Sequence, residues 1–291
     1  MLINYRPELR PEERALPLSK YYDLPLHEMG PLFRQIIDYG PLKREDSITA
    51  ADWMEHLALP GVYKRPVFGY RVMEDGTGYL ASYSLYTAAT PKMMQWYFRW
   101  INIPSQNQPR GCGNLRYKIW CPPCHITHGF INGKDKYGGV YTLEALELEK
   151  DKQDYFFTVR TAVDLKGLGL SDDMEKMLSE SGVWLDAAVE NFYELNGTDY
   201  EHPGRQMPGS HLCLTMSRPC LTGGMEKVTL EWIGYTVADN KVRRDESTPQ
   251  YMFSEDWLKM ALVHTTTEAQ QLGKFLPDLY AEYSVKPDDA D

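Results

Sequence analysis

The sequence predicts an α+β protein in which a curved antiparallel sheet grips one long C-terminal helix. Helical patterns lie near the N-terminus, strand patterns separated by Gly, Pro, Asp and Asn clusters fill the middle, and one long helical pattern comes last. This segregation of helices from strands is typical of α+β folds, whereas strict alternation indicates a parallel sheet. A sheet curled around a helix encloses a pocket, so we expect a helix-grip arrangement with an N-terminal helical extension.

The N-terminal region is predicted to combine an extended arm with two helices. Residues 1–25 are punctuated by proline and have no hydrophobic periodicity. Residues 28–38 and 47–58 carry apolar side chains at helical spacing. We therefore divide the chain into an N-terminal region, residues 1–65, and a main domain, residues 66–291.

Strands dominate the first part of the main domain. Residues 67–87 have the pattern of two strands joined by the glycine-rich turn "DGTG". Thr90 and Pro91 then begin an amphipathic helix, with proline at its first position. Further strand patterns, rich in β-branched and aromatic residues, span 115–120, 138–149, 154–163, 184–194, 210–218 and 227–237.

The last helix is predicted to begin after Ser254, whose hydroxyl can cap the first turn. Gly273 and Pro277 are expected to kink or end it. On this helix His264 and Glu268 stand four residues apart, so both side chains emerge on one face. A surface ion pair gives the same spacing, but the intervening threonines are poor choices for a free helix surface and indicate packing.

Composition limits the classes of partner. The net charge of −10 argues against nucleic acid, because phosphate binding needs a concentrated basic surface. The sequence has neither an apolar run of about 18 residues nor an apolar signal core, so we expect a cytoplasmic protein without membrane contact. The 20 tyrosines and 7 tryptophans either fill a core or line a cavity for a flat, oxygen-bearing ligand.

The segment "CPPCHITH", residues 121–128, concentrates cysteine and histidine. It matches the CxxCH haem-attachment pattern, but nothing indicates the export that haem attachment usually requires. With Cys112, its cysteines and His125 would instead form a structural zinc clip, although the spacing is not that of a zinc ribbon. A third interpretation makes Cys121 and Cys124 buried packing residues, since the odd count of five cysteines does not suggest a disulfide framework.

In this third interpretation His125 is one ligand of a catalytic metal centre. Together with His264 and Glu268 it makes a His₂Glu set that suits zinc and leaves a position for water or substrate. The sequence has no Gly-x-Ser-x-Gly, GxGxxG or P-loop pattern. A serine hydrolase or a nucleotide-dependent enzyme therefore has no support.

These residues resemble the 2,4-diacetylphloroglucinol hydrolase and phloretin hydrolase family. Tyr117 stands eight residues before His125, and His264 and Glu268 form an HxxxE pair, as in that family. The resemblance implies a zinc-dependent hydrolase that cleaves the carbon–carbon bond between an acyl group and a phloroglucinol ring. It also implies a Bet v 1-like fold whose N-terminal extension is used in dimerisation, and hence a homodimer.

The resemblance extends to the catalytic residues. His211, in "GSHLCLTMS", matches the family's further active-site histidine better than His202 does, and we expect it to act as general acid or base. Tyr117 is expected to hold substrate oxygens. The family's asparagine three residues after the first ligand is His128 here. His128 therefore either binds the substrate or takes part in acid–base chemistry.

The fourth metal ligand of the family is a glutamate whose register falls on Phe156 in this chain. The strand "YTLEALELEK" offers Glu147 and Glu149 on one face, if the intervening loop is shortened. The resemblance thus implies one of these two glutamates as the ligand and does not choose between them.

Two other functions remain open. One keeps the metal but changes the reaction to a cyclisation, an isomerisation or another retro-Claisen step on a polyketide, for which His128 is the reason. The other is a non-catalytic carrier of a hydrophobic ligand, in which His264 and Glu268 form only an ion pair. In every case the expected ligand is a small aromatic or polyketide molecule.

Overall fold

The computed structural model describes residues 5–57, 63–103, 114–131, 139–146, 148, 154–249 and 254–285. The fold is built on an eight-stranded antiparallel sheet with the order β1-β2-β8-β7-β6-β5-β4-β3. Its strands are β1 (Gly69–Val72), β2 (Gly78–Tyr86), β3 (His125–Phe130), β4 (Val140–Ala145), β5 (Tyr155–Ala162), β6 (Trp184–Asn196), β7 (Asp199–Pro219) and β8 (Met225–Ile233). A separate two-stranded ribbon pairs β9 (Tyr235–Ala238) with β10 (Lys241–Arg244).

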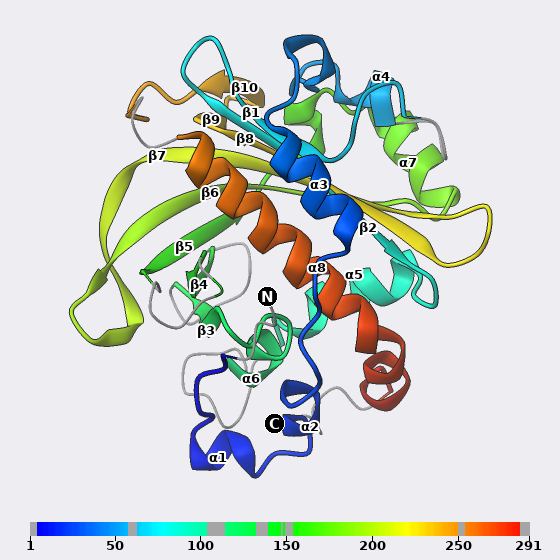
Figure 1. The fold of residues 1–291 in the computed structure, drawn as a ribbon. Coiled ribbons are helices and arrows are strands. Elements are labelled where there is room, and N and C mark those ends of the chain that lie inside the picture. Colours follow the sequence, from blue (N-terminus) through cyan, green and yellow to red (C-terminus); the bar gives the residue numbers. More distant parts are fainter. Residues whose placement is uncertain are drawn as a thin grey trace.

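The long helix α8 (Glu255–Tyr283) crosses one face of the curved sheet and packs against β1 and β2 (Figure 1). The other helical segments are α1 (Pro11–Arg14), α2 (Ser19–Tyr22), α3 (Pro31–Tyr39), η1 (Arg44–Asp46), α4 (Trp53–Leu57), α5 (Pro91–Trp100), α6 (Asn114–Lys118), η4 (Leu165–Leu168) and α7 (Asp172–Glu180). The predicted α+β fold with a curved antiparallel sheet and a C-terminal helix is therefore confirmed.

Helix α8 begins as the sequence predicts but does not end where it predicts. The Ser254 hydroxyl accepts a hydrogen bond from the backbone N–H of Trp257 at 3.1 Å. The helix then continues past Gly273 and Pro277 to Tyr283, so neither residue ends it. Gly273 has a packing role, because an added Cβ would lie 2.5 Å from the ring of Tyr86 on β2. Close approach of helix and sheet requires glycine at this position.

The strands place polar and apolar side chains on opposite faces of the sheet. On β7, His211 and Cys213 line the concave side, whereas Leu212 and Leu214 enter a hydrophobic core on the other side. The same alternation recurs along β5 and β8. Because successive side chains of a strand point to opposite faces, the sheet separates a polar interior from an apolar outer layer.

The outer layer is covered by segments from two distant parts of the chain. Trp53 of α4 and Leu178 of α7 pack into the core formed by the outward side chains of β7 and β8. The indole N–H of Trp53 donates to the carbonyl oxygen of Leu168 at 3.0 Å, and that of Trp232 donates to Ile48 at 2.8 Å. Both faces of the central strands are therefore covered.

Several local predictions are wrong. Residues 115–120 form helix α6 and the turn after it rather than a strand, since Leu115 and Ile119 are one helical turn apart and both enter the core beside α5 and α8. The expected extended arm, residues 1–25, contains the short helices α1 and α2. Strand β3 and helix α7 had no counterpart in the prediction. Tertiary packing overrides local β-propensity in α6.

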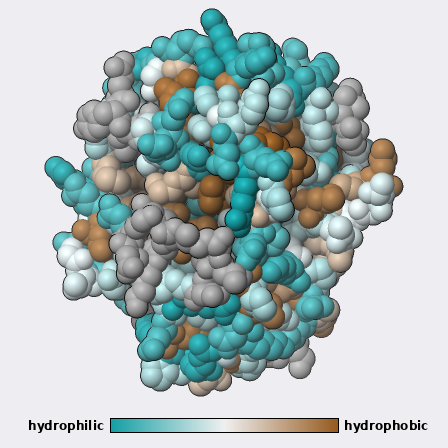
Figure 2. Space-filling view, in the orientation of Figure 1, coloured by the Kyte–Doolittle hydropathy of each residue, from teal (hydrophilic) through white to brown (hydrophobic). Residues whose placement is uncertain are grey.

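The described surface is mainly hydrophilic on the face shown in Figure 2, with separate hydrophobic patches between hydrophilic side chains. Helix α3 exposes Leu32, Ile36 and Tyr39. Within the described ranges, no helix combines the length and the apolar character needed to cross a bilayer.

Candidate metal centre and cavity

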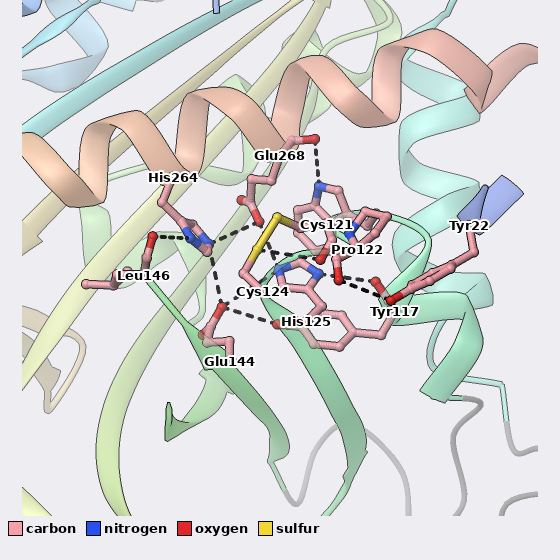
Figure 3. Close-up of a disulfide and its surroundings, with 11 residues drawn as sticks. Tyr22, Tyr117, Cys121, Pro122, Cys124, His125, Glu144, Leu146, His264 and Glu268 are labelled. Atoms are coloured by element: carbon pink, nitrogen blue, oxygen red, sulfur yellow. Dashed lines mark hydrogen bonds and ion pairs between the residues drawn. A yellow bond between two sulfur atoms is a disulfide. The ribbon is translucent and has the colours of Figure 1, made fainter. Parts of the chain in front are cut away.

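Four side chains from three elements meet at one point beneath α8. His125 comes from β3, Glu144 from the paired strand β4, and His264 and Glu268 from α8. The Nε2 atom of His125 lies 3.2 Å from Glu268 Oε2 and 3.8 Å from Glu144 Oε2. The Nε2 atom of His264 lies 3.6 Å and 3.8 Å from the same two oxygens. Figure 3 shows both imidazoles and both carboxylates pointing toward one another.

Backbone carbonyls hold both imidazoles through Nδ1. The Nδ1 of His125 lies 3.1 Å from the carbonyl oxygen of Tyr117, and that of His264 lies 3.3 Å from the carbonyl oxygen of Leu146. A proton placed on Nδ1 donates to the carbonyl and leaves the Nε2 lone pair free. This is how proteins fix the tautomer and orientation of a metal-binding histidine.

The donor set fits a divalent metal ion. Four tetrahedral ligands about 2.0–2.1 Å from zinc are separated from one another by roughly 3.4 Å. The distances of 3.2 to 3.8 Å between Nε2 and carboxylate oxygens bracket that value. In addition, the buried Nε2 of His125 makes no hydrogen bond with the described residues. Two neutral imidazoles and two carboxylates are ligands that zinc accepts.

Tyr117 of α6 supports the centre with its side chain as well as its carbonyl. Its phenol ring lies parallel to the His125 imidazole, with 3.8 Å between ring centroids. Its hydroxyl donates to Glu144 Oε2 at 3.2 Å, and Thr158 donates to Glu144 Oε1 at 2.8 Å. Burial, together with the charges of Glu144 and Glu268, raises the pKa of Tyr117 well above its ordinary value. Tyr117 is therefore a neutral hydrogen-bond donor.

The carboxylates make the centre strongly electronegative. Burial disfavours a charged Glu268, but the adjacent imidazoles of His125 and His264 lower the pKa of Glu268 to about 2. Burial likewise disfavours a charged His264, but the adjacent carboxylate of Glu268 raises the pKa of His264 to about 9. Positive charge is thus stabilised at this point, as a cation-binding site requires.

The cysteines next to this centre are bonded to each other. Cys121 and Cys124 form a disulfide, which lies beside His125 (Figure 3). Both residues are buried, as the packing interpretation expects. The expectation drawn from the odd cysteine count is nevertheless wrong for this pair. Two cysteines three residues apart can bond to each other without any wider disulfide framework. Sulfurs bonded to each other offer neither a thiolate to zinc nor a thiol to haem.

The centre opens into a cavity of about 390 Å³ between α8 and the concave face of the sheet. Aromatic side chains form one wall, where the ring of Phe98 lies 5.2 Å from Trp120 and 5.5 Å from Trp184. Most of the buried tyrosines, including Tyr79 and Tyr97, instead fill the core. The buried tyrosines therefore mainly fill the core, whereas Phe98, Trp120 and Trp184 line the cavity.

A second polar cluster faces the same cavity. His211 on β7 donates from Nε2 to Glu190 on β6 at 2.9 Å, and Glu231 on β8 lies 3.6 Å from the same nitrogen. Arg160 on β5 pairs with Glu190 and, at 2.6 Å, with Asp186. Burial disfavours the imidazolium, but the charge and hydrogen bond of Glu190 raise the pKa of His211. The cluster therefore favours the protonated form of His211 inside the cavity.

His128 lines the cavity in a different protonation state. Its Nε2 hydrogen-bonds to Asn102 Oδ1 at 3.1 Å, and its ring stacks on Tyr117 with 5.3 Å between centroids. Burial, with a contribution from His125, lowers the pKa of His128 to about 3. The imidazole is therefore neutral at physiological pH.

The structure brings together most of the residues that the sequence singled out. His125, His264 and Glu268 converge, and Tyr117 contacts this group. His128 and His211 line the same cavity. His202 instead pairs with Asp199 on the exposed part of β7. Glu147, Glu149 and Cys112 lie outside the described residues. Sequence reasoning missed Glu144, although Val140, Thr142 and Glu144 alternate along the predicted strand and all face the cavity.

An α+β fold that encloses a buried cluster of histidines and carboxylates beside an aromatic cavity defines a candidate metalloenzyme. The family model "DAPG hydrolase PhiG domain" matches residues 49–145. A 2,4-diacetylphloroglucinol hydrolase of Pseudomonas sp is 21% identical over 94% of this chain and 90% of its own length. One from Pseudomonas protegens is 21% identical over 94% of this chain and 86% of its length. The chain is related to the 2,4-diacetylphloroglucinol hydrolase family, which confirms the resemblance seen in the sequence.

Proposed function

We propose that this protein is a zinc-dependent hydrolase that cleaves the carbon–carbon bond between an acyl group and a phloroglucinol-like ring, on a Bet v 1-like helix-grip fold. The observation that carries the proposal is the convergence of His125, Glu144, His264 and Glu268 at the wall of a buried cavity. The relatives, named as 2,4-diacetylphloroglucinol hydrolases, supply the reaction class.

The four ligands would hold zinc at the edge of the cavity, where its Lewis acidity would polarise a carbonyl or phenolic oxygen of the substrate. Tyr117 keeps His125 in its metal-binding tautomer and Glu144 in its orientation through the contacts described above. The aromatic wall of Phe98, Trp120 and Trp184 accepts the flat ring and excludes water from one face of it.

His211 is suited to the proton transfer that this reaction needs. The overall change adds one proton to the ring carbon that carried the acyl group and one hydroxyl to the acyl carbon, which leaves as a carboxylic acid. Protonation of the ring carbon breaks aromaticity and makes the acyl carbon open to attack by water. Because Glu190 favours the protonated form of His211, His211 is the general acid that delivers this proton.

His128 has the properties of a substrate-binding residue rather than an acid. Its low pKa and its hydrogen bond to Asn102 keep the imidazole neutral and fixed in orientation. We therefore propose that His128 shapes the ring-binding part of the cavity and contributes to substrate selection.

The reaction is tested by incubating the zinc-loaded protein with 2,4-diacetylphloroglucinol and a panel of other acylated polyphenols. The proposal expects equimolar release of a free carboxylic acid and a ring with one acyl group fewer. The variant His264→Ala should lose this release, whereas His202→Ala, at an exposed histidine, should keep it. Ring products without free acid would indicate a cyclase or isomerase, and tight binding without turnover would indicate a carrier; either result rejects hydrolysis.

We also propose that the protein is a cytoplasmic homodimer in which residues 1–65 contribute the interface. The exposed side chains of Leu32, Ile36 and Tyr39 on α3 support this, because one apolar helix face in water favours a partner surface. Light scattering after size exclusion tests it. The triple variant Leu32→Ser, Ile36→Ser, Tyr39→Ser should run as a monomer if this face is the interface.

A further inference from the structure

Lys227 is a buried cation at the wall of the cavity. It lies on β8, opposite Ser84 of β2 and Ser217 of β7, near the middle of the sheet. Its exposed fraction is only 4%, and it faces the cavity together with Thr229 and Glu231, two and four residues further along the strand. The alternation of β8 therefore directs a positive charge toward the ligand space.

Two aromatic rings flank the ammonium of Lys227, and no carboxylate of the described chain lies within ion-pair distance of it. Its Nζ lies 6.0 Å from the ring centroids of both Phe98 and Trp120. In the described part of the chain it forms no hydrogen bond and no ion pair within 4 Å. Trp120 in turn donates its indole N–H to the carbonyl oxygen of Glu268 at 3.1 Å and meets His125 edge-on at 5.0 Å. Lys227 thus flanks the aromatic wall that adjoins the metal centre.

The other buried cations of the described chain have polar partners, which for Arg116 are the backbone carbonyls of Trp100 and Ile103. Lys118 contacts Glu13 at 2.7 Å, and Arg218 pairs with Glu226. Burial lowers the pKa of Lys227, and the charge of Glu268 offsets this only in part. A buried ammonium without a partner is costly unless an anion reaches it. Lys227 has no such partner in the described chain, so a ligand that supplies one would stabilise it.

The charges around the cavity indicate which kind of ligand Lys227 would attract. A divalent ion bound at the centre would be neutralised by the carboxylates of Glu144 and Glu268, and Glu268 would then no longer compensate Lys227. The guanidinium of Arg160 is already paired with Asp186 and Glu190. Glu231 lies 3.6 Å from His211 on the same cavity wall. Lys227 is then the buried cavity cation that has no carboxylate within 4 Å among the described residues, and a ligand with a negatively charged oxygen would supply that contact.

We propose that Lys227 is the counter-ion for an ionised phenolic oxygen, so that the protein binds its aromatic ligand as a phenolate. This rests on the proposed function and deepens it, since an acyl group on a polyphenol ring makes the ring hydroxyls more acidic. The ring would lie against Phe98 and Trp120 while the phenolate oxygen accepts a charge-assisted hydrogen bond from Nζ. Lys227 then positions the ring and selects ionised phenols over neutral ones.

The probe is 4-nitrophenol, whose ionised form has a visible absorption band that the neutral form lacks. At a pH near its own pKa, the zinc-loaded protein should bind it and raise its ionised fraction. Lys227→Met removes the charge at nearly constant volume and should weaken binding of the ionised form by roughly tenfold or more. Lys227→Gln provides a second neutral side chain, and Lys176→Met, at an exposed lysine, is the matched control. Circular dichroism verifies that each variant is folded.

The results separate Lys227 from the metal as the source of ionisation. An increase in the phenolate band that is lost in the folded Lys227 variants and kept in Lys176→Met supports the proposal. An increase that survives in Lys227→Met attributes the ionisation to the metal and overturns it, as does failure of the wild-type protein to bind the probe. The assay needs no turnover, so it stays informative if acylated polyphenols are not hydrolysed.

Discussion

The imidazole of His125 lies parallel to the phenol ring of Tyr117, with 3.8 Å between centroids and 5° between planes, and its Nδ1 is 3.1 Å from the carbonyl oxygen of the same tyrosine. One residue therefore fixes both the tilt and the tautomer of a candidate metal ligand. The tyrosine hydroxyl extends this control to Glu144. The short helix α6 thus acts as a support for half of the metal centre.

Replacement of Tyr117 separates these roles. Tyr117→Phe keeps the stacking and the backbone contact but removes the hydrogen bond to Glu144. We expect zinc affinity to fall by about tenfold, at the low end of what supporting residues contribute, and Tyr117→Ala to lose considerably more. Competition with a zinc-binding dye measures the affinity. Equal affinities in wild type and Tyr117→Ala would show that Tyr117 does not support the centre.

Glu144 is expected to be a metal ligand although the sequence did not single it out. Glu144→Gln retains the shape of the side chain but replaces a carboxylate by a neutral amide, so zinc affinity should fall by at least roughly 100-fold. Glu255→Gln, at an exposed position in the first turn of α8, is the control. Full zinc occupancy in Glu144→Gln under limiting zinc would remove Glu144 from the ligand set.

The pairing of Glu190 with His211 predicts a pH dependence. A general acid works while it is protonated, so the rate should fall as pH rises through the raised pKa of His211. Glu190→Gln removes the negative charge that stabilises the imidazolium and lowers that pKa. The alkaline limb of kcat against pH should therefore move to lower pH. Glu194→Gln, an exposed neighbour on β6, should leave the profile in place; an unmoved limb in Glu190→Gln would contradict the role of His211.

The contact between Glu13 and Lys118, two residues that do not line the cavity, predicts a large effect on stability. Glu13 is fully buried, and both of its oxygens lie within 2.8 Å of the Lys118 ammonium. Glu13→Gln leaves that ammonium buried without a counter-charge, so the free energy of unfolding should fall by about 3 kcal/mol. Urea denaturation measures this, with the exposed Glu12→Gln as control. A change below about 0.5 kcal/mol would place the pair among ordinary surface contacts.

The disulfide is expected to be dispensable for metal binding. The double variant Cys121→Ser, Cys124→Ser removes both sulfurs and should keep the zinc content of the wild type, because His125 binds through Nε2 and its Nδ1 is held by Tyr117 rather than by a cysteine. Elemental analysis of the purified variant measures this. Loss of zinc would instead support the structural clip.

The elements with strong local signals could be predicted from the sequence. The cap at Ser254, the Pro91 start of α5 and the glycine turn before β2 all depend on neighbouring residues, and all three occur in the structure. Helix α6 could not be predicted, because Leu115, Arg116 and Lys118 favour a helix whereas Tyr117, Ile119 and Trp120 favour a strand. Contacts of Leu115 and Ile119 with the core beside α5 and α8 accompany the helical outcome. The prediction that Pro277 ends the last helix failed for a similar reason. Leu276 and Leu279 beside it are buried in the core, and α8 continues to Tyr283.

The candidate site likewise contains residues that the sequence alone could pair and residues that only the fold brings together. His264 and Glu268 share a helix face, so their pairing followed from spacing alone. The role of Glu144 depends on the register that places it opposite His125 across two strands, and short-range patterns do not fix that register. The unpaired charge of Lys227 was equally inaccessible, because burial and the absence of an ion pair in the described chain are properties of the fold.

The central claim is tested most directly by the zinc content per chain of protein purified without added metal, measured by elemental mass spectrometry beside His264→Ala and Glu268→Gln. The account predicts about one zinc per wild-type chain and far less in both variants. A folded wild-type protein that contains no zinc and takes none up when it is supplied would contradict the metal centre, and with it the proposed hydrolase.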